Sequence, residues 1–389
     1  MFTVDTYTPT RVILGPGRLD ELATVKLPGT KALICVTADG LMEKLGIQQR
    51  VIDLLAKNGA EAAVFGEINP NPDRETVMAA AALAKKEGCD FTLGLGGGSS
   101  IDVAKATAIL IENEGDLWDY AEVGTGGGKP LEKAAPIVTV STTCGTGTET
   151  DQYCVITKPE TAEKIDFTID ALFPTLSIID PDLMASLPKT QTLYQGWDAF
   201  FHNAECYITN NNQNKLLDLF TIEGFTTVYE WLPKALEDGN DLEARTHMSY
   251  GANILGGYAM AHCFVTTHHI IGQMMGGVYP RVPHGATLIF IAKEFYRLWA
   301  PKFPEFFDKM GQLLGVEPDP ANPGFGFATA VEKLMAVTGA DQLKMSDFGI
   351  EPSSFEQIAD NTINLVGIDW DRYVMSKEEI IELLEKSYR

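Results

Sequence analysis

The sequence predicts an α/β domain built on a parallel sheet, followed by an all-helical domain, and three observations lead there. Short apolar runs alternate with helical periodicity in the first half, which is typical of a parallel sheet covered on both faces. A glycine-rich turn joins one such run to a helix, and strand patterns nearly vanish after about residue 187. Because 389 residues exceed one compact core, we place a domain boundary between residues 1–185 and 186–389.

The individual elements follow from periodicity and from length. Apolar runs of the buried-strand type occupy residues 31–36, 62–65, 91–95, 137–140 and 177–180. Helical patterns lie between them at residues 41–57, 73–86 and 99–111. The second half contains helical patterns at residues 191–208, 216–236, 242–261 and 286–298, with several more toward the end.

Charge and cysteine usage exclude several classes of function. The chain has 30 Lys+Arg against 53 Asp+Glu and a net charge of -23, so it would repel nucleic-acid phosphates and anionic lipid. The N-terminal residues lack the pattern of a signal peptide, and no apolar stretch is long enough to span a bilayer. The six scattered cysteines suit reduced thiols better than disulfides. We therefore expect a cytoplasmic protein that binds neither nucleic acid nor membrane.

Three polar loops are expected at the carboxyl edge of the sheet, where open α/β folds bind ligands. Residues 96–100 (GGGSS) join a strand to a helix, where glycines let the backbone approach a pyrophosphate and free N–H groups favour an anion. Residues 141–149 (STTCGTGTE) and 69–72 (NPNP) follow two other strands. Each of these loops taken alone could equally be a connection that binds no ligand. Three of them at one edge of the sheet indicate a binding cleft.

Asp198 and His202 lie four residues apart in a largely apolar helical pattern, so both side chains leave the same helix face. A buried carboxylate requires a cation. Four of the six histidines follow within 23 residues: His262, His268, His269 and His284. One carboxylate and three imidazoles suit Fe(II) or Zn(II). The sequence therefore predicts a metal centre.

These segments, together with residues 180–183 (DPDL) and 283–285 (PHG), resemble the iron-containing (group III) alcohol dehydrogenases in order over nearly the whole chain. The resemblance implies a Rossmann-like dinucleotide-binding domain, a helical domain and a catalytic metal in the cleft between them, the dehydroquinate synthase-like architecture. It also implies a dimer or a higher homo-oligomer. The cofactor contacts that it implies are Asn71, Gly97, Gly98, Ser99, Asp102, Thr142, Thr143, Tyr153, Lys164 and Leu183.

The same resemblance makes Asp198, His202 and His284 metal ligands. The family usually has two histidines four apart, the first a ligand and the second near the nicotinamide. We expect His268 to be the third ligand, with His269 and His262 as alternatives. Gly272 stands four residues after His268, which leaves the proton-relay residue unassigned.

The cofactor preference depends on the residues that follow the predicted strand at residues 31–36. The family often has an aspartate there that binds the adenosine ribose, whereas this chain has Ala38 followed by Asp39. If Asp39 reaches the ribose, NAD is preferred; if it does not, NADP is tolerated. We expect NAD.

The predicted function is hydride transfer between a small alcohol or aldehyde and NAD(P), with the metal as a Lewis acid on the substrate oxygen. Phe200, Phe201 and Phe264 flank the predicted ligands and would favour small unbranched or aromatic substrates over sugars. The alternatives are a polyol dehydrogenase, another metal-dependent enzyme of the same superfamily, or a nucleotide-binding protein without catalysis.

Overall fold

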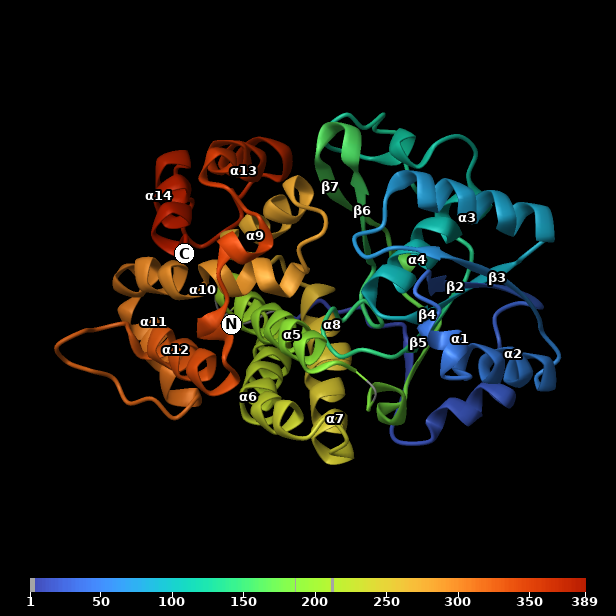
Figure 1. Cartoon of the computed structure of the whole chain (residues 1–389), viewed down its shortest axis with the longest axis horizontal. Helices are drawn as coiled ribbons and strands as arrows, with labels where there is room; N and C mark the ends of the chain where they lie inside the picture. The colour runs from blue at the N-terminus through green and yellow to red at the C-terminus, as the bar shows by residue number, and fades with distance from the viewer. Residues whose placement is uncertain (1–3, 186, 211–212) are drawn as a thin grey trace.

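The structure, a computed structural model, describes residues 4–185, 187–210 and 213–389. It has two parts side by side, a sheet covered by helices and a bundle of helices (Figure 1). The last strand of the sheet ends at Ile179, and the long helix α5 (Lys189–Asn210) opens the helical part. The predicted fold class, a parallel-sheet domain followed by helices, is confirmed. The expected domain boundary touches residue 186, which lies outside the described residues.

The main sheet has six strands, all parallel, in the order β1-β8-β5-β4-β2-β3. The strands are β1 (Arg11–Leu14), β2 (Lys31–Thr37), β3 (Glu61–Ile68), β4 (Phe91–Gly96), β5 (Ile137–Ser141) and β8 (Leu176–Ile179). Because the strands run the same way, the loops after them gather at one edge. Gly96 pairs with Ser141, and Ser141 pairs with Ile179, so the glycine turn and the STTCGTGTE loop are neighbours.

Helices cover both faces of this sheet (Figure 1). On one face, α1 (Leu41–Lys44) and α2 (Ile47–Lys57) pack their apolar residues onto β2, β4, β5 and β8. On the other, α3 (Arg74–Glu87) and α4 (Gly98–Glu112) form a second core with a hairpin, β6 (Tyr153–Lys158) and β7 (Glu163–Thr168). Parallel strands buried on both faces account for the apolar runs in the sequence.

Several elements differ from the sequence-based prediction. The single helix expected over residues 41–57 is two helices, because Gly46 has a left-handed φ of 70° between them. The helix expected over residues 242–261 contains a π-helical stretch, η6 (Tyr250–Gly256), between α7 (Leu242–Ser249) and α8 (Gly257–Met260). Strand β1 and the antiparallel β6–β7 hairpin were not predicted, since neither has a long apolar run.

The helical part packs around α5, most of whose residues from Thr192 onward are buried. Its other main helices are α6 (Lys215–Glu237), α9 (Thr267–Val278), α10 (His284–Trp299), α11 (Pro304–Leu313), α12 (Gly326–Thr338), α13 (Phe355–Asn361) and α14 (Lys377–Ser387). One continuous apolar core joins them. Within the described ranges, none of the helices has the length and apolar character needed to cross a bilayer.

The two parts touch where Gly257 of α8 lies against Gly147 and Thr150 of the loop after β5. A methyl group at Gly257 would overlap the Gly147 carbonyl oxygen and the Thr150 hydroxyl. We expect Gly257→Ala to lower the free energy of unfolding by about 1–3 kcal/mol, the usual cost of overpacking. Urea denaturation measures it. Gly66→Ala is the control, because its new methyl would meet only Val36 Cγ1, at 3.9 Å. Equal effects of the two substitutions would contradict this prediction.

Candidate metal and cofactor site

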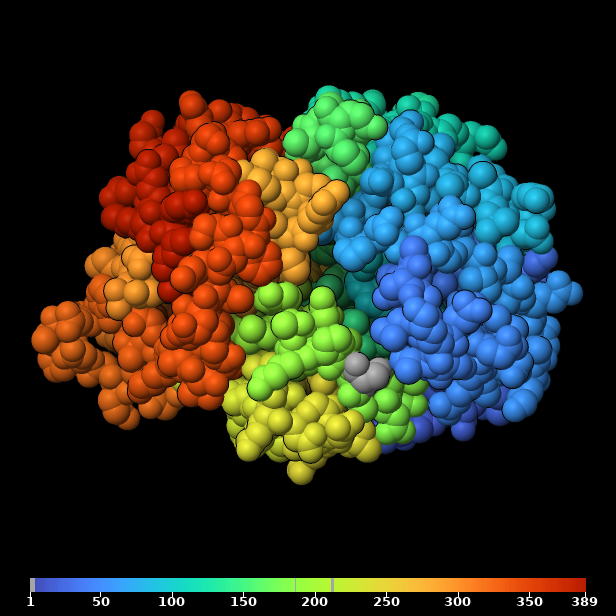
Figure 2. All heavy atoms as spheres, in the orientation of Figure 1, coloured from blue at the N-terminus to red at the C-terminus, as the bar shows by residue number. Residues whose placement is uncertain are grey.

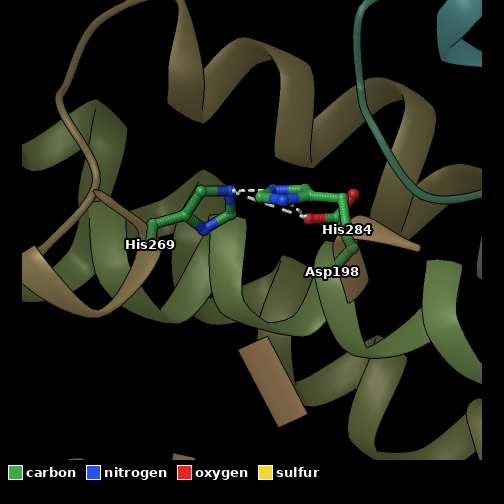
Figure 3. A group of neighbouring side chains, drawn as sticks. All are labelled: Asp198, His269 and His284. Carbon is green, nitrogen blue, oxygen red and sulfur yellow. Dashed lines mark hydrogen bonds and ion pairs between the residues drawn. The ribbon is translucent and has the colours of Figure 1, made fainter. Parts of the chain in front are cut away.

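Helices α5, α9 and α10 bring one carboxylate and three imidazoles together in the helical part. Asp198 and His202 come from one face of α5, His269 from the first turn of α9, and His284 from the first residue of α10. The Nε2 atoms of His202, His269 and His284 lie 3.5, 3.7 and 3.7 Å from Asp198 Oδ1. Asp198, His269 and His284 face one another with their donor atoms within 4.8 Å (Figure 3).

Asp198, His269 and His284 are placed so that they could hold a divalent cation, and His202 lies beside them, 3.5 Å from Asp198. Asp198 Oδ1 is buried and accepts no hydrogen bond from any residue that the structure describes. The His269 and His284 Nε2 atoms approach each other to 2.9 Å, as two ligands of one ion do. Burial, the largest cause, lowers the pKa of His284 well below its ordinary value, and Lys164 adds to this. Burial also lowers the pKa of His202, whereas at His269 the effect of burial is outweighed by Glu205 and Asp198, which raise its pKa. A neutral imidazole offers a lone pair to a metal, and mixed N/O donors suit Fe(II) or Zn(II).

The structure does not bring the expected third ligand, His268, to this cluster. Its Nδ1 lies 2.7 Å from Glu205 Oε1 and its Nε2 lies 3.0 Å from the Leu288 carbonyl oxygen, so both ring nitrogens are already engaged. The ring is fully buried against Phe201 and Tyr296. His269 takes its place, because consecutive helical residues point about 100° apart.

The other alternative, His262, also lies away from the cluster. Its Nε2 accepts a hydrogen bond from the Tyr7 backbone N–H at 2.9 Å, and its Nδ1 lies 2.7 Å from the Tyr258 carbonyl oxygen. Gly272 is buried, and a Cβ there would meet Leu288 at 2.6 Å, so this position faces α10. The residue four after His269 is Gln273, which faces the cavity beside the cluster and donates from Nε2 to the Lys164 carbonyl oxygen.

A cavity of about 380 Å³ joins the histidine cluster to the carboxyl edge of the sheet. The space-filling view shows the surface hollowed between the sheet part and the helical part (Figure 2). The predicted cofactor residues that line the cavity are Asn71, Gly98, Ser99, Asp102, Tyr153 and Lys164, and the cluster residues that line it are Asp198, His202, His269 and His284. Residues predicted separately as cofactor contacts and as metal ligands therefore share one space.

The glycine turn allows close packing at the start of α4. A Cβ at Gly97 would lie 2.8 Å from Thr143 Cγ2, and one at Gly98 would lie 2.7 Å from Thr146 Cγ2. Thr142 is held beside them by its N–H, which donates to the Gly96 carbonyl oxygen. Side chains at Gly97 and Gly98 would occupy the space between the N-terminus of α4 and the loop after β5. This geometry suits a backbone cradle for an anion.

The remaining predicted cofactor residues do not line the cavity in the described structure: Asp39, Gly97, Thr142, Thr143 and Leu183. Leu183 is buried in the core under the sheet. The Asp39 side chain is exposed at the end of β2 and accepts from the Thr37 hydroxyl and the Leu41 N–H, both at 3.0 Å. Its carboxylate thus accepts from the first N–H of α1 and lies outside the lining of the cavity.

Two ionisable side chains, Lys105 and Asp102, support the wall of the cavity, and this role was not predicted for either of them. The ammonium of Lys105 is fully buried and donates to Thr148 Oγ1, Asp151 Oδ1 and the Tyr153 carbonyl oxygen, each at 2.9 Å. Burial raises the pKa of the neighbouring Asp102 carboxyl to about 7. Lys105 thus connects α4 to the segment before β6 by hydrogen bonds. These bonds hold in place the part of α4 that carries Ser99 and Asp102.

Apolar side chains form the wall of the cavity on the helical side. Met260, Phe264, Val265, Ile270 and Trp370 line it, and the Phe264 and Trp370 rings lie 5.1 Å apart. Of the three phenylalanines expected around the ligands, only Phe264 lines the cavity. The other two, Phe200 and Phe201, are fully buried core residues.

The sequence matches one family over almost its whole length. Residues 9–181 match the family described as iron-containing alcohol dehydrogenase, and residues 192–388 match the C-terminal part of the Fe-containing alcohol dehydrogenase family. The NAD-dependent methanol dehydrogenase of Bacillus methanolicus is 30% identical over 392 residues, which cover 98% of this chain and 92% of that protein. The 1,3-propanediol dehydrogenase of Klebsiella pneumoniae is 30% identical over 366 residues, covering 92% and 91%.

Solved structures agree with this match. A crystal structure of an archaeal halo-thermophilic alcohol dehydrogenase from a Red Sea brine pool superposes with a TM-score of 0.92 at 28% identity, covering 100% of this chain and 99% of that one. NADH-dependent butanol dehydrogenase A from Thermotoga maritima superposes with a TM-score of 0.86 at 29% identity and the same coverage. The chain belongs to the iron-containing alcohol dehydrogenase family. The predictions of that family and of a metal-dependent alcohol dehydrogenase are confirmed.

Lys164 gives the site a testable pH dependence. Burial lowers its pKa from 10.5 to about 8, although Asp102 and Asp198 oppose this. Since the folded-state pKa lies below the unfolded one, the charged lysine destabilises the fold below pH 8, and this cost disappears as the pH rises toward 10.5. We expect Lys164→Met to raise the free energy of unfolding of the metal-free protein at pH 7 by about 1–3 kcal/mol, and by less at pH 10.

Urea denaturation at both pH values measures the effect. Lys26→Met serves as the control, because Lys26 is exposed. A gain from Lys164→Met that is equal at pH 7 and pH 10 would show that the burial of charge is not its cause.

Proposed function

We propose that the protein interconverts small alcohols and aldehydes with NAD, and that Asp198, His202, His269 and His284 hold its catalytic metal, Fe(II) with Zn(II) as the alternative. The observation that carries this proposal is the convergence of three imidazole Nε2 atoms on the unpartnered carboxylate oxygen of Asp198. The family description and the NAD-dependent relative support the iron and the NAD. Asp39, at the end of β2, is the carboxylate available to favour NAD over NADP.

The bound metal would supply Lewis acidity toward the substrate oxygen, and bound NAD would accept or donate the hydride. The chain's own residues provide positioning. Gly97, Gly98 and Ser99 leave room for a pyrophosphate at the start of α4. Lys164 donates to Asn71 Oδ1 at 3.0 Å, so these two present fixed polar groups to the same cavity. Phe264 and Trp370 cover its apolar side and limit the access of water.

The substrate class follows from the lining of the cavity. Apart from histidines, Lys164 is the one basic side chain among the lining residues that the structure describes. Substrates with phosphate or carboxylate groups would have little to bind them, whereas the wall around Phe264 and Trp370 suits apolar chains. The named relatives act on methanol and on 1,3-propanediol, which are small and uncharged. We infer that the substrates are small uncharged alcohols and aldehydes.

We also propose that residues 1–185 and 186–389 form two domains, that the protein acts in the cytoplasm, and that it assembles as a homodimer or higher oligomer. The change from strands to helices supports the first point. Six free cysteines, five of them buried, support a reducing compartment. The oligomer rests on the family resemblance, and light scattering of the purified protein tests it.

Metal-dependent turnover tests the proposed function. We expect purified protein to oxidise NADH in the presence of small aldehydes, to lose this activity with a chelator, and to regain it with Fe(II) or Zn(II). Absorbance at the NADH band measures the rate, with NADPH compared in parallel. An anionic aldehyde of similar size is the substrate control and should react more slowly. No turnover with any pair, despite stoichiometric metal, would overturn the alcohol dehydrogenase assignment.

Substituting the adjacent histidines separates the two candidates for the third ligand. We expect His269→Gln to lose stoichiometric metal, because one of four donors is removed. His268→Gln should retain the metal but lower the free energy of unfolding, by about 3–5 kcal/mol if Glu205 is left as an unpaired buried charge. Elemental analysis and urea denaturation measure the two effects. Metal loss in His268→Gln together with retention in His269→Gln would restore the original assignment.

A further inference from the structure

Glu205 lies on the same face of α5 as two of the proposed metal ligands. It follows Asp198 by seven residues and His202 by three, so all three side chains point from one side of the helix. Its side chain has no solvent exposure. A carboxylate in such surroundings must be matched by donors, since burying an unpaired charge is costly. Glu205 was not singled out from the sequence, although the spacing of these three residues is a signal for it.

Each oxygen of this carboxylate has its own partners. Oε2 accepts hydrogen bonds from the Thr266 N–H at 2.9 Å and from the Thr266 hydroxyl at 3.0 Å. Oε1 lies 2.7 Å from Nδ1 of His268 and 3.6 Å from Nδ1 of His269. One side chain of α5 therefore contacts the beginning of α9 and both of its adjacent histidines.

The ion pair between Glu205 and His269, with Oε1 3.6 Å from Nδ1, favours one position for the hydrogen of the imidazole ring. Nε2 of His269 is the atom that faces Asp198 and His284, and Nδ1 is the atom that faces Glu205. A carboxylate beside Nδ1 favours the N–H at that position, which leaves the lone pair on Nε2, where a metal would need it. In the described structure, Nδ1 of His202, His269 and His284 all lack a hydrogen-bond partner, but only Nδ1 of His269 forms an ion pair with a carboxylate, that of Glu205 at 3.6 Å. Glu205 thus acts on one histidine of the cluster.

We propose that Glu205 is a positioning residue for the metal centre: it holds the tautomer and the ring orientation of His269, and with His268 and Thr266 it anchors the start of α9. This inference rests on the proposed metal site. Loss of a carboxylate that holds a metal-binding histidine typically weakens metal affinity by about 10–100-fold. The two ring nitrogens of His268 face Glu205 and the Leu288 carbonyl oxygen, so this buried ring connects Glu205 to α10.

The test compares Glu205→Gln with Asp371→Asn. Asp371 is a second carboxylate at the start of α9, where it accepts from the N–H and the hydroxyl of Thr267, and among the described residues it forms no hydrogen bond or ion pair with a histidine. Both substitutions keep the size of the side chain and replace its carboxyl group by an amide. The dissociation constant for Zn(II), measured by competition with a chromophoric chelator, and the visible spectrum of the Co(II) form provide readouts that do not depend on turnover.

We expect Glu205→Gln to weaken Zn(II) binding about 10–100-fold and to change the Co(II) spectrum, and we expect Asp371→Asn to leave both unchanged. Unchanged Zn(II) affinity in Glu205→Gln with only a lower unfolding temperature would overturn the inference, as would equal weakening in both variants. If Glu205→Gln does not fold, Glu205→Asp retains the charge but shortens its reach, and unchanged Zn(II) affinity there also overturns it. Failure of the unsubstituted protein to bind any divalent metal would instead overturn the proposed metal site itself, and the inference with it.

Discussion

The carboxylate of Asp198 is buried among three imidazoles, and much of the helical part is arranged around it. Its Oδ1 has three Nε2 atoms within 3.7 Å and no hydrogen-bond donor in the described structure. Without a cation, a charge in this position costs several kcal/mol, roughly, in lost solvation. The cluster needs side chains from three helices, so α5, α9 and α10 must pack with the ends of α9 and α10 against the middle of α5. The apolar core that surrounds them supplies that rigidity.

The sheet contributes the other half of the site through its parallel topology. Every strand ends at the same edge, so loops distant in sequence, such as those after β4 and β5, become neighbours there. The β6–β7 hairpin then carries Tyr153 and Lys164 into the cavity. The chain has a net charge of -23, and Lys164 places a basic side chain in the lining of the cavity. Its bond to Asn71 joins the hairpin to the loop after β3.

Local patterns allowed much of this arrangement to be predicted. The apolar runs predicted five strands of the sheet, and four of these, β2, β4, β5 and β8, are inner strands that are almost entirely buried. Strands covered on both faces are mostly apolar, which makes them visible in the sequence. The hairpin escaped prediction because its strands mix polar and apolar residues, as in Lys164 and Asp166. The split between α1 and α2 depends on the left-handed backbone of Gly46, and a glycine within a helical pattern does not by itself reveal its φ.

The sequence by itself determined the fold class, the family and the close pairing of Asp198 with His202, because these depend on periodicity and on spacing within one helix. It also located the glycine turn and the edge of the sheet that it occupies. Only the tertiary structure decided between His268 and His269, since they are adjacent and differ only in direction around α9. That direction depends on how α9 is rotated against α5 and α10, which Glu205, Thr266 and the surrounding core fix through contacts between distant segments.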